Sequence, residues 1–335
     1  MTGSRIGCDV DWDRDGKQVS RLRVPWSRNS SAWGSVQVPI AQVKNGDGPT
    51  VLFTAGAHGD EYEGPLALSE LARELVPEDV AGRVIVLPGM NVPALRESTR
   101  LCPIDGLDLN RSFPGSRNGT YTPMMAHFVA TELVPRADVV IDMHSGGYSL
   151  WFTPCVIVHQ VDDAAMHARG MDALRAFGAP LGMVLRELDD AGQLDTFVEE
   201  RGTLFISTEL AGGGQVTPEA VRVGHRGAWN LLAHFGLVAK DHARVDGRPT
   251  ERVVEVPSLG CYVLAPEDGV FEPLVDLSAE VVAGARVARL VSLEDLARPP
   301  IDLHTRRGGT VFCRRSPGRA ECGDTLIVVA EDARG

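Results

Sequence analysis

Lysine is scarce in this 335-residue sequence, where it occurs only at Lys17, Lys44 and Lys240. Nearly all of the 33 basic residues are therefore arginines. Catalysis that depends on a lysine side chain, such as chemistry through a Schiff base, is nearly excluded by this composition.

The sequence also lacks paired cysteines and long apolar runs. Its six cysteines are scattered without a C-x-x-C pair, so neither a thiolate zinc site nor a disulfide framework is indicated, and we expect reduced thiols in a cytoplasmic protein. The N-terminal stretch "MTGSRIGCDVDWDRDGKQ" has no apolar core of signal-peptide length. No later stretch is apolar for long enough to span a bilayer, so we expect no membrane partner.

The overall composition is that of an ordinary globular protein, with 44% hydrophobic and 23% charged residues. A formal net charge of -12 argues against nucleic acid or an anionic membrane surface as the main partner. The length exceeds what one core usually accommodates, so we expect a main domain and a smaller one.

Strand-like and helix-like segments alternate up to about residue 240, which predicts an α/β sheet. Short apolar runs at 82–91, 138–147 and 203–214 favour buried strands, whereas residues 64–76, 122–137 and 218–238 have helical spacing. After residue 240 the sequence changes to short strands and Gly/Pro turns, which indicates a small all-β barrel or sandwich. We therefore predict a first domain at 1–242 and a second at 243–335.

Two short motifs suggest a metal site. The stretch "FTAGAHGDEYEGP" places His58 and Glu61 three residues apart after an apolar run, and a catalytic metal site needs a third protein ligand. His144 ends the run "VVIDMH", where Asp142 points to the same strand face and could orient an imidazole. Either motif alone is more typical of a polar residue with satisfied hydrogen bonds. Because both end predicted strands and precede glycine, we interpret His58, Glu61 and His144 as a His₂Glu metal site.

Two further stretches offer catalytic and binding groups. Glu209 ends the strand-like run "FISTE", where partial burial would raise its pKa toward the range useful for proton transfer; alternatively it is a surface acid beside the glycine turn. Asn110 and Arg111 in "LDLNRSFPG" suit capture of a carboxylate, and a structural salt bridge is the alternative. Other histidines occur in helical or mixed contexts without a second ligand nearby and are interpreted as structural; they include His127, His159, His225 and His234.

The stretches "GAHGDEYEG", "LDLNRSFPG", "DMHSGG" and "STELAGGG" occur in this order and resemble the succinylglutamate desuccinylase/aspartoacylase family, relatives of the zinc carboxypeptidases. The resemblance covers about residues 35–240. It implies a carboxypeptidase-like mixed sheet flanked by helices, with a smaller C-terminal all-β domain, and one Zn²⁺ ion per chain. The implied site residues are the zinc ligands His58, Glu61 and His144, the carboxylate-binding Asn110 and Arg111, and the general base Glu209. A further arginine of the family polarises the scissile carbonyl; Arg100 is the candidate here, at a longer spacing from Asn110 than in aspartoacylases.

The resemblance also implies the class of substrate, which is a small N-acyl amino acid. Aspartoacylases carry an arginine about ten residues before the base glutamate, whereas this sequence has Asp195, Glu199 and Glu200 in that region. Acidic side chains would repel a second substrate carboxylate and attract an amine, unless they form a solvated helix face or loop. Within the family, "HGDEYEGP" and "STELAGGG" are similar to stretches of the N-alpha-acetyl-L-2,4-diaminobutyrate deacetylases of ectoine breakdown, whose substrate carries a free amine.

Three other functions remain open at this point. A desuccinylase or a metallocarboxypeptidase would use the same chemistry on another substrate, and a protein could hold zinc without catalysis. The region 265–292 resembles biotinyl or lipoyl carriers, but those need a modified lysine and no lysine follows Lys240. The C-terminal part is therefore expected to shape the rim of the site or to form a contact in a homo-oligomer.

Overall fold

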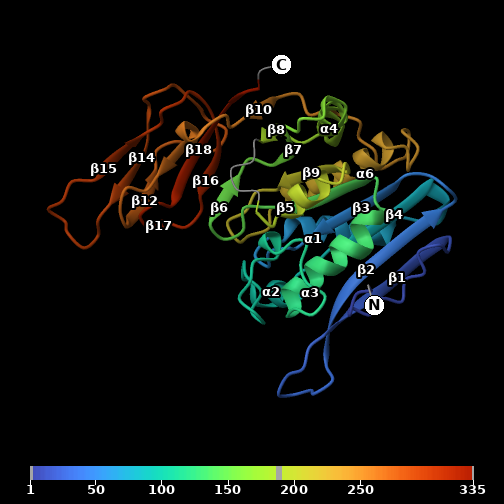
Figure 1. The fold of residues 1–335 in the computed structure, drawn as a ribbon. Helices are drawn as coiled ribbons and strands as arrows, with labels where there is room; N and C mark the ends of the chain where they lie inside the picture. Colours follow the sequence, from blue (N-terminus) through green and yellow to red (C-terminus); the bar gives the residue numbers. More distant parts are fainter. Residues whose placement is uncertain (1–2, 186–190, 334–335) are drawn as a thin grey trace.

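The computed structural model describes residues 3–185 and 191–333. Within these residues, fourteen strands form one mixed sheet, and four others form a separate antiparallel sheet near the C-terminus. Helices pack on both faces of the larger sheet (Figure 1). The expected α/β architecture with a smaller all-β part is confirmed.

The bounds of the elements are as follows. The larger sheet contains β1 (Gly16–Pro25), β2 (Ser35–Asn45), β3 (Thr50–Ala55), β4 (Gly82–Leu87), β5 (Val139–His144), β6 (Leu150–Phe152), β7 (Cys155–His159), β8 (Leu181–Leu185), β9 (Leu204–Glu209), β10 (Val253–Glu255), β11 (Tyr262–Leu264), β13 (Glu280–Val281), β16 (Gly309–Arg315) and β18 (Thr325–Asp332). The separate sheet contains β12 (Gly269–Pro273), β14 (Arg286–Val291), β15 (Ile301–His304) and β17 (Arg319–Ala320). The α-helices are α1 (Glu63–Glu74), α2 (Val92–Glu97), α3 (Tyr121–Phe128), α4 (Ala164–Phe177), α5 (Leu194–Glu199) and α6 (Pro218–His234).

The strands at the centre of the larger sheet are apolar along nearly their whole length. Every residue of β3, "TVLFTA", is buried, as are the first five residues of β5, "VVIDM". Such runs are expected where helices cover both faces of a sheet. β3, β5 and β9 are parallel neighbours, so their carboxyl ends meet at one edge of the sheet. Binding sites of open α/β sheets collect at that edge.

Two hydrophobic clusters lie on opposite faces of this sheet. Residues of α1, α4 and α6 form one cluster with strand side chains, and residues of α3 and α5 contribute to the other. α6 begins at Pro218, where the Thr217 side chain accepts a hydrogen bond from the Ala220 backbone N–H. Gly227 lets α6 approach Phe177 of α4 closely, since a Cβ atom there would lie 2.2 Å from the Phe177 ring.

Glu74, at the end of α1, ties this helix to α6. Its Oε2 accepts hydrogen bonds from His225 Nε2 at 2.7 Å and from Trp229 Nε1 at 3.2 Å, and Arg244 pairs with Oε1 at 2.5 Å. The Glu74 side chain is 13% exposed. The carboxylate therefore satisfies a fully buried indole N–H and links two helices with the segment that follows α6.

We expect Glu74→Ala to lower the free energy of unfolding by about 2–3 kcal/mol, because the variant leaves buried donors without an acceptor. Urea denaturation followed by circular dichroism would measure the change. Glu70→Ala is the matched control on the same helix. Glu70 forms an ion pair with the exposed Arg73 at the surface, so its removal should change stability little. Equal effects of the two variants would contradict the role given to Glu74.

The C-terminal part contributes to both sheets. β12, β14, β15 and β17 pack against β11, β16 and β18 around an apolar cluster. β10, β16 and β18 also extend the larger sheet beyond β8. β10 pairs with β8 in parallel, and β16 pairs with β6 (Figure 1). The larger sheet thus crosses the boundary predicted between residues 242 and 243. The division of the chain into two domains at this boundary stays a prediction.

The structure also describes the state of the cysteines and the apolar character of the helices. All six cysteines, each of which is among the described residues, have free thiols. No helix within residues 3–185 and 191–333 combines the length and the apolar character needed to cross a membrane.

Candidate metal centre and active-site cleft

His58 and Glu61 lie in the turn that joins β3 to α1. Gly56 follows β3 with a φ of +67°, a conformation that glycine adopts without strain. Gly59 packs against the backbone of α2, where a Cβ atom would lie 2.0 Å from the Ala94 carbonyl carbon. The two glycines allow a compact turn, and His58 and Glu61 are each only 2% exposed in it.

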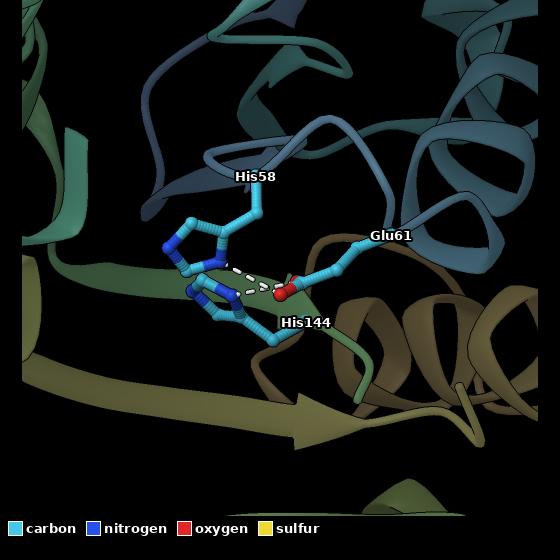
Figure 2. A group of neighbouring side chains, drawn as sticks. All are labelled: His58, Glu61 and His144. Atoms are coloured by element: carbon cyan, nitrogen blue, oxygen red, sulfur yellow. Dashed lines mark hydrogen bonds and ion pairs between the residues drawn. The ribbon is translucent and has the colours of Figure 1, made fainter. Parts of the chain in front are cut away.

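His144, at the end of β5, completes a cluster with these two residues (Figure 2). His58 Nδ1 lies 2.7 Å from Glu61 Oε1, and His144 Nδ1 lies 2.9 Å from Glu61 Oε2. One ligand atom from each residue lies within 4.8 Å of the others. Two imidazole nitrogens and one carboxylate oxygen are the donor set of many catalytic zinc sites, so the cluster fits a divalent metal ion.

The outer nitrogen of each imidazole contacts an aspartate. His58 Nε2 lies 3.0 Å from Asp108 Oδ1, and His144 Nε2 lies 2.9 Å from Asp142 Oδ2. Asp142 in turn accepts a hydrogen bond from Thr54 Oγ1 at 2.8 Å. Carboxylates in this position hold a ligand ring in one orientation, here with Nδ1 toward the centre of the cluster. The contact of Asp142 was expected from the strand pattern, whereas Asp108 was not identified from the sequence.

The electrostatics of the cluster favour positive charge at its centre. Although burial opposes the shift, the two imidazoles hold the pKa of Glu61 well below its usual range. Burial lowers the pKa of His144, but the neighbouring carboxylates of Asp142 and Glu61 raise it well above its usual value. Protons on the imidazole nitrogens would compete with a metal ion for this position. A metal ion has to displace these protons, so its affinity should rise with pH.

Glu209, at the end of β9, lies beside the metal cluster. In the parallel pairing of β5 with β9, Glu209 is the register partner of His144, and both line the same cleft. Glu209 Oε2 is buried and has no hydrogen-bond partner among the described residues. Burial and the neighbouring negative charge of Glu61 raise the pKa of Glu209 to about 8. A carboxyl group with such a pKa can take up and release a proton near neutral pH.

Three residues with amide or guanidinium donors line the cleft near the metal cluster. Asn110 Oδ1 accepts from the Leu194 backbone N–H at 3.0 Å, so the donor that its side chain offers is the NH₂ group. Arg111 donates from Nη1 to the Asn110 carbonyl oxygen at 2.8 Å. Arg100 is half-exposed, and its Nη2 lies 3.1 Å from Asp108 Oδ2. The structure thus brings Arg100, Asn110 and Arg111 to one cleft despite the longer spacing.

The three acids of the region 195–200 occupy different positions. Asp195 is 9% exposed and lines the cleft. Glu199 lies behind it, with both carboxylate oxygens 3.1 Å from His159 Nδ1. Glu200 is on the surface, where it is 69% exposed and faces Arg201. His159, which was interpreted from the sequence as structural, ends β7 and lines the cleft wall.

The cleft has a cavity volume of about 200 Å³. It lies at the carboxyl ends of the central strands, as expected for an α/β sheet. Neutral and apolar groups complete its wall: Ser145, Gly146, Ser149, Leu150, Phe152, Ile157, Leu185, Gln193, Phe205, Ser207 and Thr208. The histidines at positions 127, 225 and 234 are not part of this wall.

The order and geometry of these residues agree with a comparison against known protein families. Residues 47–235 match the family described as the succinylglutamate desuccinylase/aspartoacylase catalytic domain. The chain belongs to the succinylglutamate desuccinylase/aspartoacylase family. The expected family resemblance is thereby confirmed, and with it the reading of the chain as an amidohydrolase with a His58, Glu61 and His144 metal-binding cluster.

Similar proteins of this family cover nearly the whole chain. An N-alpha-acetyl-L-2,4-diaminobutyric acid deacetylase from Halomonas elongata is 42% identical over 328 residues, which are 98% of this chain and 95% of the relative. A succinylglutamate desuccinylase/aspartoacylase from Rhodobacter sphaeroides has a crystal structure with a TM-score of 0.92 and 45% identity, covering 98% of this chain and all of the other. The product-bound ectoine utilization protein EutE from Ruegeria pomeroyi has a TM-score of 0.93 and 41% identity, covering 98% and 99% of the two chains.

Proposed function

We propose that this protein hydrolyses the amide bond of N-alpha-acetyl-L-2,4-diaminobutyrate, with one zinc ion held by His58, Glu61 and His144. Water and the substrate yield acetate and 2,4-diaminobutyrate. Identity of 42% over nearly the full length to a deacetylase of this substrate supports the reaction, and ectoine degradation is the corresponding pathway. A zinc ion bound there supplies Lewis-acid polarisation of the amide carbonyl and makes water more acidic.

Glu209 is the proton carrier of this proposal. Its Oε2 lies at the edge of the metal cluster, is buried, and has no partner among the described residues, so it can receive the proton of the attacking water. The same oxygen then delivers the proton to the α-nitrogen as the carbon–nitrogen bond breaks. The raised pKa supports both steps, since the group must bind and release a proton in one cycle.

Asn110 and Arg111 are proposed to bind the α-carboxylate of the substrate. The NH₂ group of Asn110 and the guanidinium of Arg111 offer donors on one wall of the cleft, which suits a planar carboxylate. Arg100, close to the metal cluster, is proposed to polarise the acyl oxygen. Fixing the carboxylate places the amide over the metal cluster and reduces the entropy lost on reaching the transition state.

The observation in the cleft that carries the choice of substrate is Asp195. Its side chain is nearly buried in the cleft wall. In this region of the sequence an aspartoacylase would be expected to have an arginine. A second substrate carboxylate would meet this like charge in a partly desolvated site, whereas a side-chain ammonium would form an ion pair with it. Glu199 reaches the cleft only through His159, and Glu200 faces the solvent.

The substrate assignment predicts a large difference between two N-acetyl amino acids. The wild-type protein should cleave N-alpha-acetyl-diaminobutyrate with a kcat/KM at least about a hundredfold above that for N-acetylaspartate, because mispaired like charge costs several kcal/mol. Asp195→Asn should remove most of this preference. Glu200→Gln, which neutralises an exposed acid on the same segment, is the control and should keep it. Equal rates on the two substrates, or a preference for acetylaspartate, would leave only the general amidohydrolase assignment.

A further inference from the structure

The active-site cleft extends in two directions from Glu209. Phe205, Ser207 and Glu209 alternate along β9 and all line the cleft, so one face of this strand follows its length. His159 stacks on Phe205 with ring centroids 6.2 Å apart, and Asp195 Oδ2 lies 4.0 Å from His159 Nε2. The position proposed for the substrate ammonium, beside Asp195, is therefore on the side of Glu209 where β9 begins.

Phe152 lies on the opposite side of Glu209. Its backbone N–H donates at 3.1 Å to the carbonyl oxygen of Ala211, which follows the end of β9. A Cβ atom on Gly146, which follows the end of β5, would lie 3.0 Å from the Phe152 ring. Because Phe152 also lines the cleft, it bounds the part of the cleft that lies beyond the carboxyl ends of these two strands.

The C-terminal part of the chain holds Phe152 in place. Phe152 is 9% exposed, and its ring packs edge-to-face on Phe312 of β16, with centroids 5.2 Å apart and an angle of 65° between the planes. Phe152 is also the register partner of Cys313 in the pairing of β6 with β16, and all three residues belong to one apolar cluster. A ring packed in this way cannot move aside for a larger ligand without opening the cluster.

The two ends of the proposed substrate extend to opposite sides of its scissile amide. A planar trans amide directs its acyl group and its Cα atom in opposite directions. With the amide beside Glu209 and the ammonium beside Asp195, the acyl group points toward Phe152. The wall residues at this end of the cleft carry no charge and suit an apolar acyl group: Ser145, Gly146, Ser149, Leu150 and Phe152.

We infer that Phe152 is a specificity-determining residue, which limits the acyl group of the substrate to the size of acetyl by bounding the cleft beyond Glu209. This inference rests on the proposed function and extends it from the amino-acid part of the substrate to the acyl part. Phe312 acts through Phe152, because it contacts the Phe152 ring and is not itself part of the cleft wall. The C-terminal part of the chain thereby takes part in the choice of substrate.

The test compares acyl groups of two lengths on the zinc-loaded enzyme. N-alpha-acetyl-L-diaminobutyrate and N-alpha-butyryl-L-diaminobutyrate share the amino-acid part and differ by two methylene groups. The wild-type kcat/KM should be about 10- to 100-fold higher for the acetyl substrate, because the longer chain overpacks against the Phe152 ring. Phe152→Ala should bring the two values within about threefold of each other, since removal of the ring leaves room for the additional methylene groups.

Phe312→Leu tests the supporting contact with a smaller change in volume. It should lower the acetyl-to-butyryl ratio of kcat/KM about three- to tenfold, because Phe152 loses the ring that holds it. Phe205→Leu is the matched control, since Phe205 lines the cleft on the ammonium side of Glu209. It should affect both substrates alike and keep their ratio within about twofold of wild type. Thermal denaturation would show whether each variant is folded, and Phe312→Leu decides the test if Phe152→Ala is not.

Similar rates of the wild-type enzyme on the two substrates would overturn the inference. An unchanged ratio in folded Phe152→Ala, or a shift of the same size in Phe205→Leu, would also overturn it and leave Phe152 as a packing residue. Failure of the proposed function has a different signature, because the wild-type enzyme would then cleave neither acyl-diaminobutyrate. In that case the acetyl-to-butyryl ratio is measured on the N-acyl amino acid that the enzyme does cleave.

Discussion

Glu209→Gln is expected to lower kcat by about 10²- to 10⁴-fold while zinc content and KM stay close to wild type. Glutamine keeps the size and polarity of the side chain but cannot take a proton from water. The position of Glu209 beside His144, its buried Oε2 and its raised pKa support the proposed role of this residue in proton transfer. Steady-state kinetics with acetyl-diaminobutyrate and metal analysis of the same preparation would measure the three quantities.

Glu63→Gln is a matched control for this experiment. Glu63 is fully buried, has two carboxylate oxygens without a hydrogen-bond partner among the described residues, and, like Glu209, has a pKa that burial raises, here to about 7. It does not line the cleft, however, so its substitution should leave kcat within a few-fold of wild type. A large loss in Glu63→Gln together with near wild-type turnover in Glu209→Gln would move the base to another residue.

Removal of either histidine of the metal cluster is expected to abolish activity by emptying the site. The wild-type protein should contain about one zinc per chain, and His58→Ala or His144→Ala should lose most of it, because two remaining ligands bind the ion too weakly. Inductively coupled plasma mass spectrometry after dialysis would give the zinc content. Zinc should also be released as the pH falls, since Glu61 and Asp142 raise the pKa of His144 and protons then compete for the ligand atoms.

His225→Ala provides the control for histidine removal in general. His225 contacts Glu74 on α1, away from the cleft, so the variant should keep its zinc even where its stability is lower. Full occupancy in both His58→Ala and His144→Ala would contradict the assignment of the metal centre.

The sequence was sufficient to predict the parts of the site that follow local patterns. β3, β5 and β9 are apolar runs with a polar residue at or just after their carboxyl ends, and parallel pairing of such strands brings these ends together. The sequence alone therefore predicts that His58, His144 and Glu209 lie at one edge of the sheet. The change of pattern after residue 240 likewise indicated the small antiparallel sheet.

The remaining site residues depend on packing between segments that are distant in sequence. Asp108 reaches His58 across fifty residues, and no periodicity marks it as different from other acids. His159 ends a strand like His144, but its partners Glu199 and Asp195 come from a helix forty residues later. Extension of the larger sheet by β10, β16 and β18 was not predicted, because short strands carry no signal for a partner so far along the chain.

The pairing of β6 with β16 also has a consequence for the order of events during synthesis of the protein. β3, β5 and β9 can pair as soon as residue 209 has left the ribosome. Leu150 and Phe152, which line the cleft, are paired with Arg315 and Cys313, which are translated after all three metal ligands and Glu209. A nascent chain can therefore acquire its metal centre while this wall is still unsupported, and the amide substrate meets a complete cleft only after β16 has joined the sheet.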